Sequence, residues 1–388
     1  MKKIMLLVVT SLFVALLMNY GFINGDHTTN QEFALKEIGH IPTEGDTYVV
    51  QAVGNIVYIL DFAEGFLIYN VSDPVYPILL GSYEGNNHIN PRVKGGHSFF
   101  VRGDYAIVGF AHAGLKILDI SDPTDLQVIG EYFGGGFSAD IMVVDNLVYL
   151  TMGYDGLQII NISIVTQPTK VGEFSNGTRL SHINVIRNFA YIDDNEQNKL
   201  LCLDITDPSN ITKEGQFEWL AIDIEMVVDI GYVAAYNYGM MVYDFSNPSN
   251  PILLSQHYDG GSTCDVEVIG DFSFVADHMD GFEILDITDP ENPIEIDQFN
   301  DGGASINVFI EGNVAYVAEH EDGLEIIQLW EENASSTSSI TTPEATKTTA
   351  ETIESESTPS FELLLIILGL FFLRKRMSFF HRYPYGKG

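Results

Sequence analysis

The chain has 388 residues, of which 46% are hydrophobic and 12% aromatic, enough to bury a large core. Lys and Arg total 18 against 54 Asp and Glu, which gives a formal net charge of −36. Nucleic-acid binding needs clustered positive side chains, so this charge excludes nucleic acid as a partner. The charge favours cations, cationic partners or a saline exterior, although an acidic coat that keeps the protein soluble is the simpler explanation.

The first residues predict export. Lys2 and Lys3 precede a nearly unbroken apolar run from Ile4 to Met18, and polar residues follow. This order is typical of a secretory signal peptide, which we assign to residues 1–25. An uncleaved N-terminal anchor is the alternative interpretation.

The middle of the chain is a repeat. A glycine-led apolar strand recurs at intervals of 40 to 49 residues, and its seven copies begin at Gly65, Gly114, Gly156, Lys199, Gly239, Gly281 and Gly323. Self-similarity at such a period is the signature of a repeat architecture. Two β-sandwiches are the main structural rival, but they would not explain seven similar periods.

Each unit divides into four strand-like pieces. The sixth unit shows them as Cys264–Ile269, Phe272–Asp277, Phe282–Ile287 and Ile294–Phe299, with turn residues between them. Four short antiparallel strands form one propeller blade, and the blades repeat radially around an axis. The seventh unit ends after its third strand, and residues 33–40 look like the missing fourth strand. We therefore expect an all-β, seven-bladed β-propeller over residues 26–330, with its last blade closed by the N-terminal strand.

Short motifs in these units are similar to a known family. Phe274-Val-Ala-Asp277, Tyr316-Val-Ala-Glu319 and Ile120-Ser-Asp-Pro123 resemble the LVIVD repeat, and the resemblance covers about residues 45–329. The resemblance implies a propeller fold. It also implies a surface protein, and it assigns no reaction.

The C-terminal end predicts anchoring at the cell surface. Ser, Thr, Glu and Ala dominate residues 331–360, which indicates an extended stalk. Residues 361–376 hold an apolar run followed by the basic cluster Arg374-Lys-Arg376, and they resemble the tripartite sorting segments of archaeal and bacterial surface proteins. A short, retained membrane anchor is the alternative. In both cases residues 377–388 form a cytoplasmic tail and the propeller lies outside.

Two further features fit an exported chain that is not built on disulfides. Asn-x-Ser/Thr sequons, typical of a glycoprotein, begin at Asn70, Asn161, Asn176, Asn210 and Asn333. Asn70 and Asn161 fall in predicted strands, so we do not expect them to carry glycans. Cys202 and Cys264 lack zinc-binding spacing and fall in different repeats, so we expect buried free thiols.

Alignment of the seven first strands reveals a candidate ligand site. One position reads Val49, Ser98, Asp140, His182, Asp223, Asp265 and Asn307, and the position two residues on includes Gln51, Asn184, Glu225 and Glu267. The first strand of a blade lies nearest the propeller axis, so these side chains are expected to line a central channel. The candidate ligand ring is Asp140, His182, Asp223, Glu225, Asp265, Glu267 and Asn307. Asp140, Asp223 and Asp265 are candidate Ca²⁺ ligands, and a water-filled channel without an ion is the simpler alternative.

The turns between second and third strands form a second candidate surface. Its residues include His112, Asp155, His278 and His320. Loops on a rigid scaffold often bind partners. His278 and His320 occupy equivalent places, which repeat symmetry explains better than a metal site. The basic insertion from Gly85 to Gly96 is a candidate partner-contact loop.

The motif inventory favours binding over catalysis. The sequence has no Gly-x-Ser-x-Gly elbow, no His-Glu-x-x-His helix and no phosphate-binding loop. We therefore predict a cell-surface-anchored, non-enzymatic binding or adhesion module that contacts a protein or glycan, with Ca²⁺ as the one cofactor considered. The alternatives are an extracellular hydrolase or lyase that uses channel carboxylates, and a purely structural envelope component.

Overall fold

The structure is a computed structural model that describes residues 33–85, 96 and 98–330. The predicted signal peptide (1–25), stalk (331–360), anchor (361–376) and tail (377–388) lie outside the described residues. So do Asn333 and almost all of the Gly85–Gly96 insertion. Within the described part, no helix combines the length and the apolar character that crossing a membrane requires.

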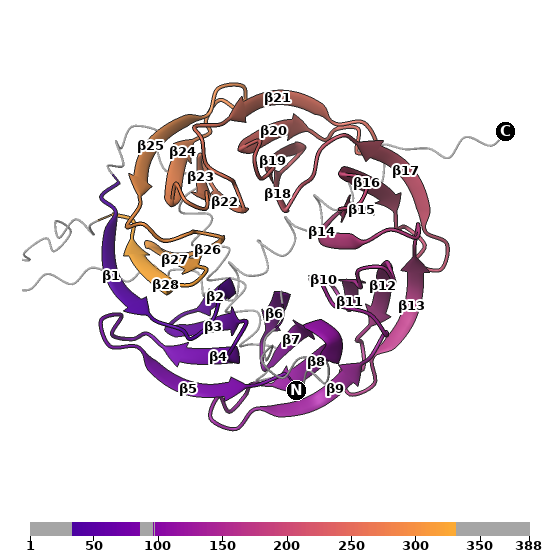
Figure 1. Cartoon of the computed structure of the whole chain (residues 1–388), viewed down its shortest axis with the longest axis horizontal. Coiled ribbons are helices and arrows are strands. Elements are labelled where there is room, and N and C mark those ends of the chain that lie inside the picture. The colour runs from indigo at the N-terminus through magenta and orange to yellow at the C-terminus, as the bar shows by residue number, and fades with distance from the viewer. Residues whose placement is uncertain (1–32, 86–95, 97, 331–388) are drawn as a thin grey trace, which may run out of the picture. The chain divides into compact units, whose positions relative to one another are not determined.

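The described residues form seven antiparallel sheets of four strands each, which confirms the predicted all-β propeller (Figure 1). Blades 1 and 2 contain β2 (Thr47–Val53), β3 (Ile56–Asp61), β4 (Gly65–Asn70), β5 (Ile78–Tyr83), then β6 (Ser98–Arg102), β7 (Tyr105–Phe110), β8 (Gly114–Asp119), β9 (Gln127–Tyr132). Blades 3 and 4 contain β10 (Asp140–Val144), β11 (Leu147–Thr151), β12 (Leu157–Asn161), β13 (Thr169–Phe174), then β14 (Leu180–Ile186), β15 (Phe189–Asp194), β16 (Lys199–Asp204), β17 (Thr212–Phe217).

The remaining blades repeat this order. Blades 5 and 6 contain β18 (Asp223–Val227), β19 (Ile230–Ala234), β20 (Met240–Asp244), β21 (Ile252–His257), then β22 (Asp265–Ile269), β23 (Phe272–Ala276), β24 (Phe282–Asp286), β25 (Ile294–Phe299). Blade 7 contains β26 (Asn307–Glu311), β27 (Val314–Glu319), β28 (Gly323–Gln328) and β1 (Lys36–Ile41). A 3₁₀ turn, η1 (Ala111–Ala113), joins β7 to β8.

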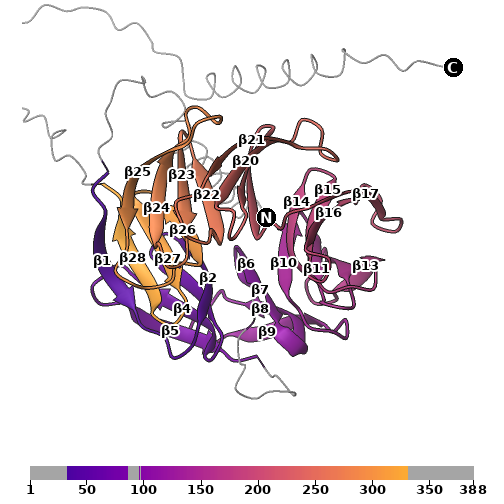
Figure 2. The ribbon, with the colours of Figure 1, turned by 45° about the horizontal axis from the view of Figure 1, so that its top comes forward.

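The N-terminal strand closes the ring, as the sequence predicts. β1 pairs antiparallel with β28, and the two lie side by side in both ribbon views (Figure 2). The regular strand begins at Lys36, three residues later than expected, and its register shifts between Glu37 and Gly39. The innermost strands contact one another all the way round the axis, including β2 against β26.

The core consists of apolar layers between adjacent blades. Ile59 and Leu67 of blade 1, for example, pack with Leu324 and Ile326 of blade 7. Both faces of an inner sheet meet a neighbouring blade, so second and third strands such as β3 and β4 are buried along most of their length and are nearly continuous apolar runs. Both cysteines are buried free thiols, which confirms that prediction.

Glycines set the distance between an outer strand and the next blade. A Cβ atom at Gly81, Gly130 or Gly172 would lie 1.9–2.0 Å from a main-chain oxygen in the turn between third and fourth strands of the following blade. Real Cβ atoms do not approach that closely, so these positions require glycine. The outer wall of the propeller is therefore held by main-chain packing as well as by the core.

Substitution of one of these glycines is expected to be costly. Gly130→Ala should lower the free energy of unfolding by about 2–3 kcal/mol, because the turn at Val165 must move to admit the methyl group. Gly215→Ala is the matched control in blade 4, where the new Cβ would lie 3.0 Å from the Ser249 oxygen. Urea unfolding measures the free energy of unfolding of both variants. Equal losses in Gly130→Ala and Gly215→Ala would contradict the packing argument.

Candidate functional site

The structure places the predicted ring on the strands that surround the axis (Figure 1). The first-row residues, here called the axial ring, are Val49, Ser98, Asp140, His182, Asp223, Asp265 and Asn307. All of them are half-buried, whereas the apolar residue that follows each one is buried. The predicted alternation along the inner strands is therefore confirmed.

Most polar side chains of the axial ring form hydrogen bonds with the backbone of the next blade. Asp140 Oδ2 accepts a hydrogen bond from the Ile183 N–H at 3.0 Å, and Asp265 Oδ2 accepts one from Val308 at 2.8 Å. Asn307 repeats the contact across the ring closure, because its Oδ1 accepts from the Val50 N–H at 2.8 Å. These hydrogen bonds link neighbouring blades, and we call each of them a clasp.

The second row makes similar contacts. Gln51 Oε1 accepts from the Val101 N–H at 2.8 Å, and Glu267 Oε2 accepts from the Ile310 N–H at 2.6 Å. A backbone N–H that would otherwise lie unpaired beside the axis is thus satisfied by a side chain from the preceding blade. The sequence identified the position of these residues but not these partners.

The carboxyl groups of blades 5 and 6 are held close together in this environment. Burial raises the pKa of Asp223 to about 6, with the backbone N–H of Ile224 opposing the shift and the charge of Asp140 adding to it. Burial and the neighbouring Asp223 charge raise the pKa of Asp265 well above its usual value. Burial also raises the pKa of Glu225 to about 7.

His182 connects the acidic residues of blades 3 and 5. Burial alone would lower the pKa of His182, but the Asp193 carboxylate, 3.1 Å from Nδ1, and the neighbouring carboxylates together outweigh burial and raise it. The charges of Asp140 and Asp223 act in the same direction. A protonated His182 would therefore offset part of the negative charge beside it.

The ring does not form a compact metal-ligand set. Four groups of three or more His, Asp or Glu ligand atoms within 4.8 Å of one another occur among the described residues, and none includes Asp140, Asp223 or Asp265. Calcium binding at the ring stays a prediction.

Two of the predicted rim residues share a pocket. His112 and Asp155 line a cavity of about 420 Å³ together with Phe137, Met152, Tyr154 and Arg179. The His112 ring packs edge-on against Phe137, with centroids 5.1 Å apart. Arg179 gives this pocket a positive group in an otherwise acidic protein. Sequence reasoning missed it because a lone arginine in a blade connector has no motif.

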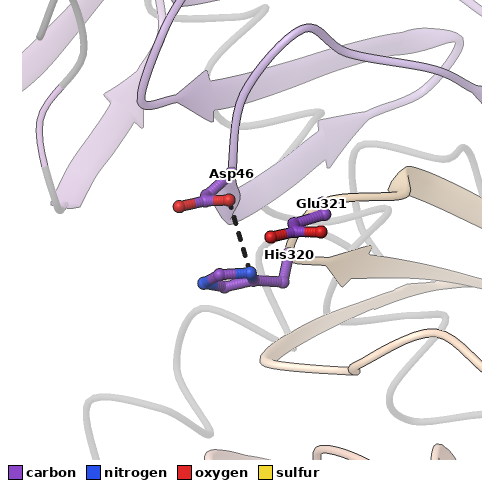
Figure 3. A group of neighbouring side chains, drawn as sticks. All are labelled: Asp46, His320 and Glu321. Atoms are coloured by element: carbon purple, nitrogen blue, oxygen red, sulfur yellow. Dashed lines mark ion pairs between the residues drawn. The ribbon is translucent and has the colours of Figure 1, made fainter.

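The other two predicted rim residues lie one blade apart and have separate surroundings. His278 and His320 both adopt positive φ values, 48° and 35°, and their backbones pair with the next blade, at Ser305 in its connector and at Thr47, the first residue of β2. His320 Nδ1 lies 3.3 Å from Asp46 Oδ1, and Glu321 is adjacent (Figure 3). Repeat geometry therefore explains their equivalence, as the sequence suggested.

A closed ring of seven four-stranded blades defines the protein as a seven-bladed β-propeller. The LVIVD repeat family matches residues 44–85, 97–133, 135–176, 180–218, 223–259, 260–301 and 302–341, and the chain belongs to that family. No curated protein matches the chain.

Solved structures share the fold at low identity. The β-propeller domain of Myceliophteria thermophila Cps50 (Swd1) is 10% identical with a TM-score of 0.60, and the match covers 76% of this chain and 99% of that one. The computationally designed Ika8 protein is 9% identical with a TM-score of 0.53, with the same coverage. At these identities the likeness concerns the fold alone.

Proposed function

We propose that the protein is a non-enzymatic binding module displayed at the cell surface, which contacts a protein or glycan through one face of the propeller. This face carries the turns between second and third strands and the connectors between blades, and we call it the top face. Display outside the cell rests on the signal-like start and the anchor-like end of the sequence.

Exposed aromatic rings are the observation that carries the proposal. Among the described residues, the exposed aromatic side chains are Tyr76, Phe133, Tyr154, Tyr236, Tyr238 and Tyr258. All except Tyr76 follow a second or a fourth strand, and both positions lie at the top face. Rigid aromatic side chains provide large contact areas for protein partners at low entropic cost.

Three of these tyrosines come from blade 5. Tyr236 and Tyr238 belong to its β19–β20 turn, and Tyr258 begins the connector that follows β21. The turn and the connector lie side by side, since Gln256 Nε2 donates a hydrogen bond to the Tyr238 carbonyl and Tyr236 pairs with Thr263. The three tyrosines therefore come from neighbouring segments of the top face, and we call them the blade 5 tyrosines.

Loss of the blade 5 tyrosines is expected to weaken binding without unfolding the propeller. The triple variant Tyr236→Asn, Tyr238→Ser and Tyr258→Ser should bind at least about tenfold more weakly, as expected for the loss of central aromatic contacts. Asn suits the positive φ of 52° at Tyr236. Labelled protein on a glycan array and on isolated cell-surface proteins provides the measurement.

The opposite face supplies the control for this experiment. Tyr76 is 73% exposed in the turn between β4 and β5, so Tyr76→Ser removes a comparable ring without touching the top face. An equal loss of binding in the triple variant and in Tyr76→Ser would contradict top-face binding. The absence of any retained ligand on both panels would contradict the binding function itself.

A hydrolase or lyase is the second candidate, because Glu225 and Glu267 have raised pKa values of about 7 and about 8, as acid–base groups require. The geometry favours binding instead. Glu267 accepts the Ile310 N–H, and Asp265 accepts both the Val308 N–H and the Asn307 amide. These carboxyls hold blades together.

A further inference from the structure

Two clusters of carboxyl groups recur at equivalent places in blades 6 and 7. The blade 6 acid cluster consists of Asp259, Asp277, Asp280 and Glu283, and the blade 7 acid cluster consists of Asp301, Glu319 and Glu325. Within each cluster, one carboxylate oxygen from each residue lies within 4.8 Å of one from every other residue. In both, the preceding connector supplies the first residue, the last residue of the second strand or the one just after it supplies the next, and the third strand supplies the last.

The deepest members of the clusters have carboxylate oxygens without partners. Glu283 is fully buried, and neither of its carboxylate oxygens has a hydrogen-bond partner. Glu319 and Glu325 are 2% and 4% exposed, and Oε2 of each also lacks a partner. An isolated buried carboxylate is strongly unfavourable unless a cation or a proton compensates it.

Neighbouring contacts fix the orientation of these acids. Thr263 Oγ1 donates to Asp277 Oδ1 at 3.0 Å, and Ser305 Oγ donates to Glu319 Oε1 at 2.7 Å. The remaining oxygens, Asp277 Oδ2 and Glu319 Oε2, lie where a Cβ on Gly261 or Gly303 would stand, at 2.1 and 1.8 Å. The glycines of the two connectors thus leave room that the carboxylates occupy.

Positive side chains near the clusters are few. No lysine or arginine of the described residues forms an ion pair with either cluster. His257 Nε2 lies 3.8 Å from Glu283 Oε2, and His40 Nε2 lies 3.9 Å from Glu325 Oε1. One histidine offsets at most one charge of each cluster. Burial and the neighbouring acids raise the pKa of Glu283 to about 9 and that of Glu325 to about 8.

The fold itself does not require these acids. The positions equivalent to Glu283 and Glu325 in the other blades are Leu67, Lys116, Gln158, Leu201 and Met241. In blade 3 the buried Gln158 is satisfied by the Tyr132 hydroxyl and the Gly134 carbonyl. Five blades thus build the same sheet without the acid cluster.

We propose that the blade 6 and blade 7 acid clusters each bind one divalent cation of the Ca²⁺ class. Several carboxylate oxygens without sulfur ligands form the donor set of a hard cation, and Ca²⁺ accepts more direct carboxylates than Mg²⁺ does. The ions lie at the top face, where they brace the connectors against the turns. The two sites are separate from the axial ring.

Calcium titration of the full chain tests the proposal. After chelation, native mass spectrometry and calorimetry should find two Ca²⁺ ions per chain, and Ca²⁺ should raise the melting temperature more than Mg²⁺ does. Glu283→Gln and Glu325→Gln should each remove one ion, and the double variant both. Each variant should still fold without metal, because the substitution replaces a buried ionisable carboxyl group by a neutral amide, and its metal-free melting temperature should equal or exceed that of the native chain.

Matched variants distinguish the clusters from general attraction to an acidic surface. Asp265→Asn in the axial ring and Asp289→Asn in an exposed turn should both keep two ions. Retention of two ions by the Glu283→Gln, Glu325→Gln double variant would overturn the proposal. The proposal would also be overturned if Asp265→Asn lost an ion while the cluster variants did not, or if the native chain bound no Ca²⁺ at all.

Discussion

A chain that begins at Pro42 is expected to lose on the order of 5 kcal/mol of unfolding free energy, because it lacks the strand that closes blade 7. β1 buries Ile41 against blade 1, and Phe33 packs edge-on against Phe272 with centroids 4.9 Å apart. Each large apolar side chain of this segment contributes roughly 1.5–3 kcal/mol when buried. The truncation also leaves β28 as an exposed edge, which promotes aggregation.

A chain that begins at Phe33 is the matched control, since it keeps every described residue of blade 7. Thermal unfolding compares the two chains. A synthetic peptide of residues 33–41 should restore part of the lost melting temperature by pairing with β28. Equal melting temperatures for the two chains would show that ring closure by β1 contributes little to stability.

The sequence was sufficient to predict the blades because the repeat supplies independent copies of the same pattern. Each glycine-led strand taken alone is ambiguous, but seven of them at a similar period permit only a radial architecture. The missing fourth strand of the last unit and the spare strand before the first then predict the closure between β28 and β1. The boundaries were less accurate, since a bulge between Glu37 and Gly39 shifts the pairing.

The candidate sites were predictable only in part. Alignment of the repeats placed Asp140 and Asp265 beside the axis, because position within a repeat fixes which strand a residue occupies. Their partners are main-chain N–H groups of the next blade, at Ile183 and Val308, and a backbone contact leaves no mark on the sequence. The sequence alone therefore does not distinguish a carboxylate that hydrogen-bonds the next blade from one that binds a metal ion.

The acid clusters of blades 6 and 7 were missed for a different reason. Their members come from a connector, a turn and a strand, so no short motif contains all the residues that form a cluster. The available signal was Glu283 and Glu325, charged residues inside otherwise apolar third strands. Only the fold shows that Asp259 and Asp301 approach these glutamates.

Metal-free protein is expected to lose stability between about pH 5 and pH 8, and Glu267→Gln should remove part of that loss. Burial raises the pKa of Glu267 to about 8 from its usual 4.5, with the Ile310 N–H opposing the shift and the Glu225 charge adding to it. Between these two values the folded state keeps a proton that the unfolded chain has released, so stability falls as pH rises. Below pH 4.5 both states are protonated, and above about pH 8 the loss is complete.

The substitution isolates this one carboxyl. The glutamine amide would keep an oxygen for the Ile310 N–H but carry no ionisable group, so the variant should match the native protein at pH 5. At pH 8 it should be more stable by about 2–4 kcal/mol, since one pKa unit corresponds to about 1.4 kcal/mol. Urea unfolding across this range, in chelator, measures the difference, and Glu214→Gln on the exposed strand β17 is the control. The other carboxyl groups with shifted pKa values are present in the native protein, in Glu267→Gln and in Glu214→Gln. If the free energy of unfolding changes with pH in the same way in the native protein and in Glu267→Gln, Glu267 is already ionised at neutral pH. The inner wall would then tolerate its negative charge, and the clasp to Ile310 would be charge-assisted.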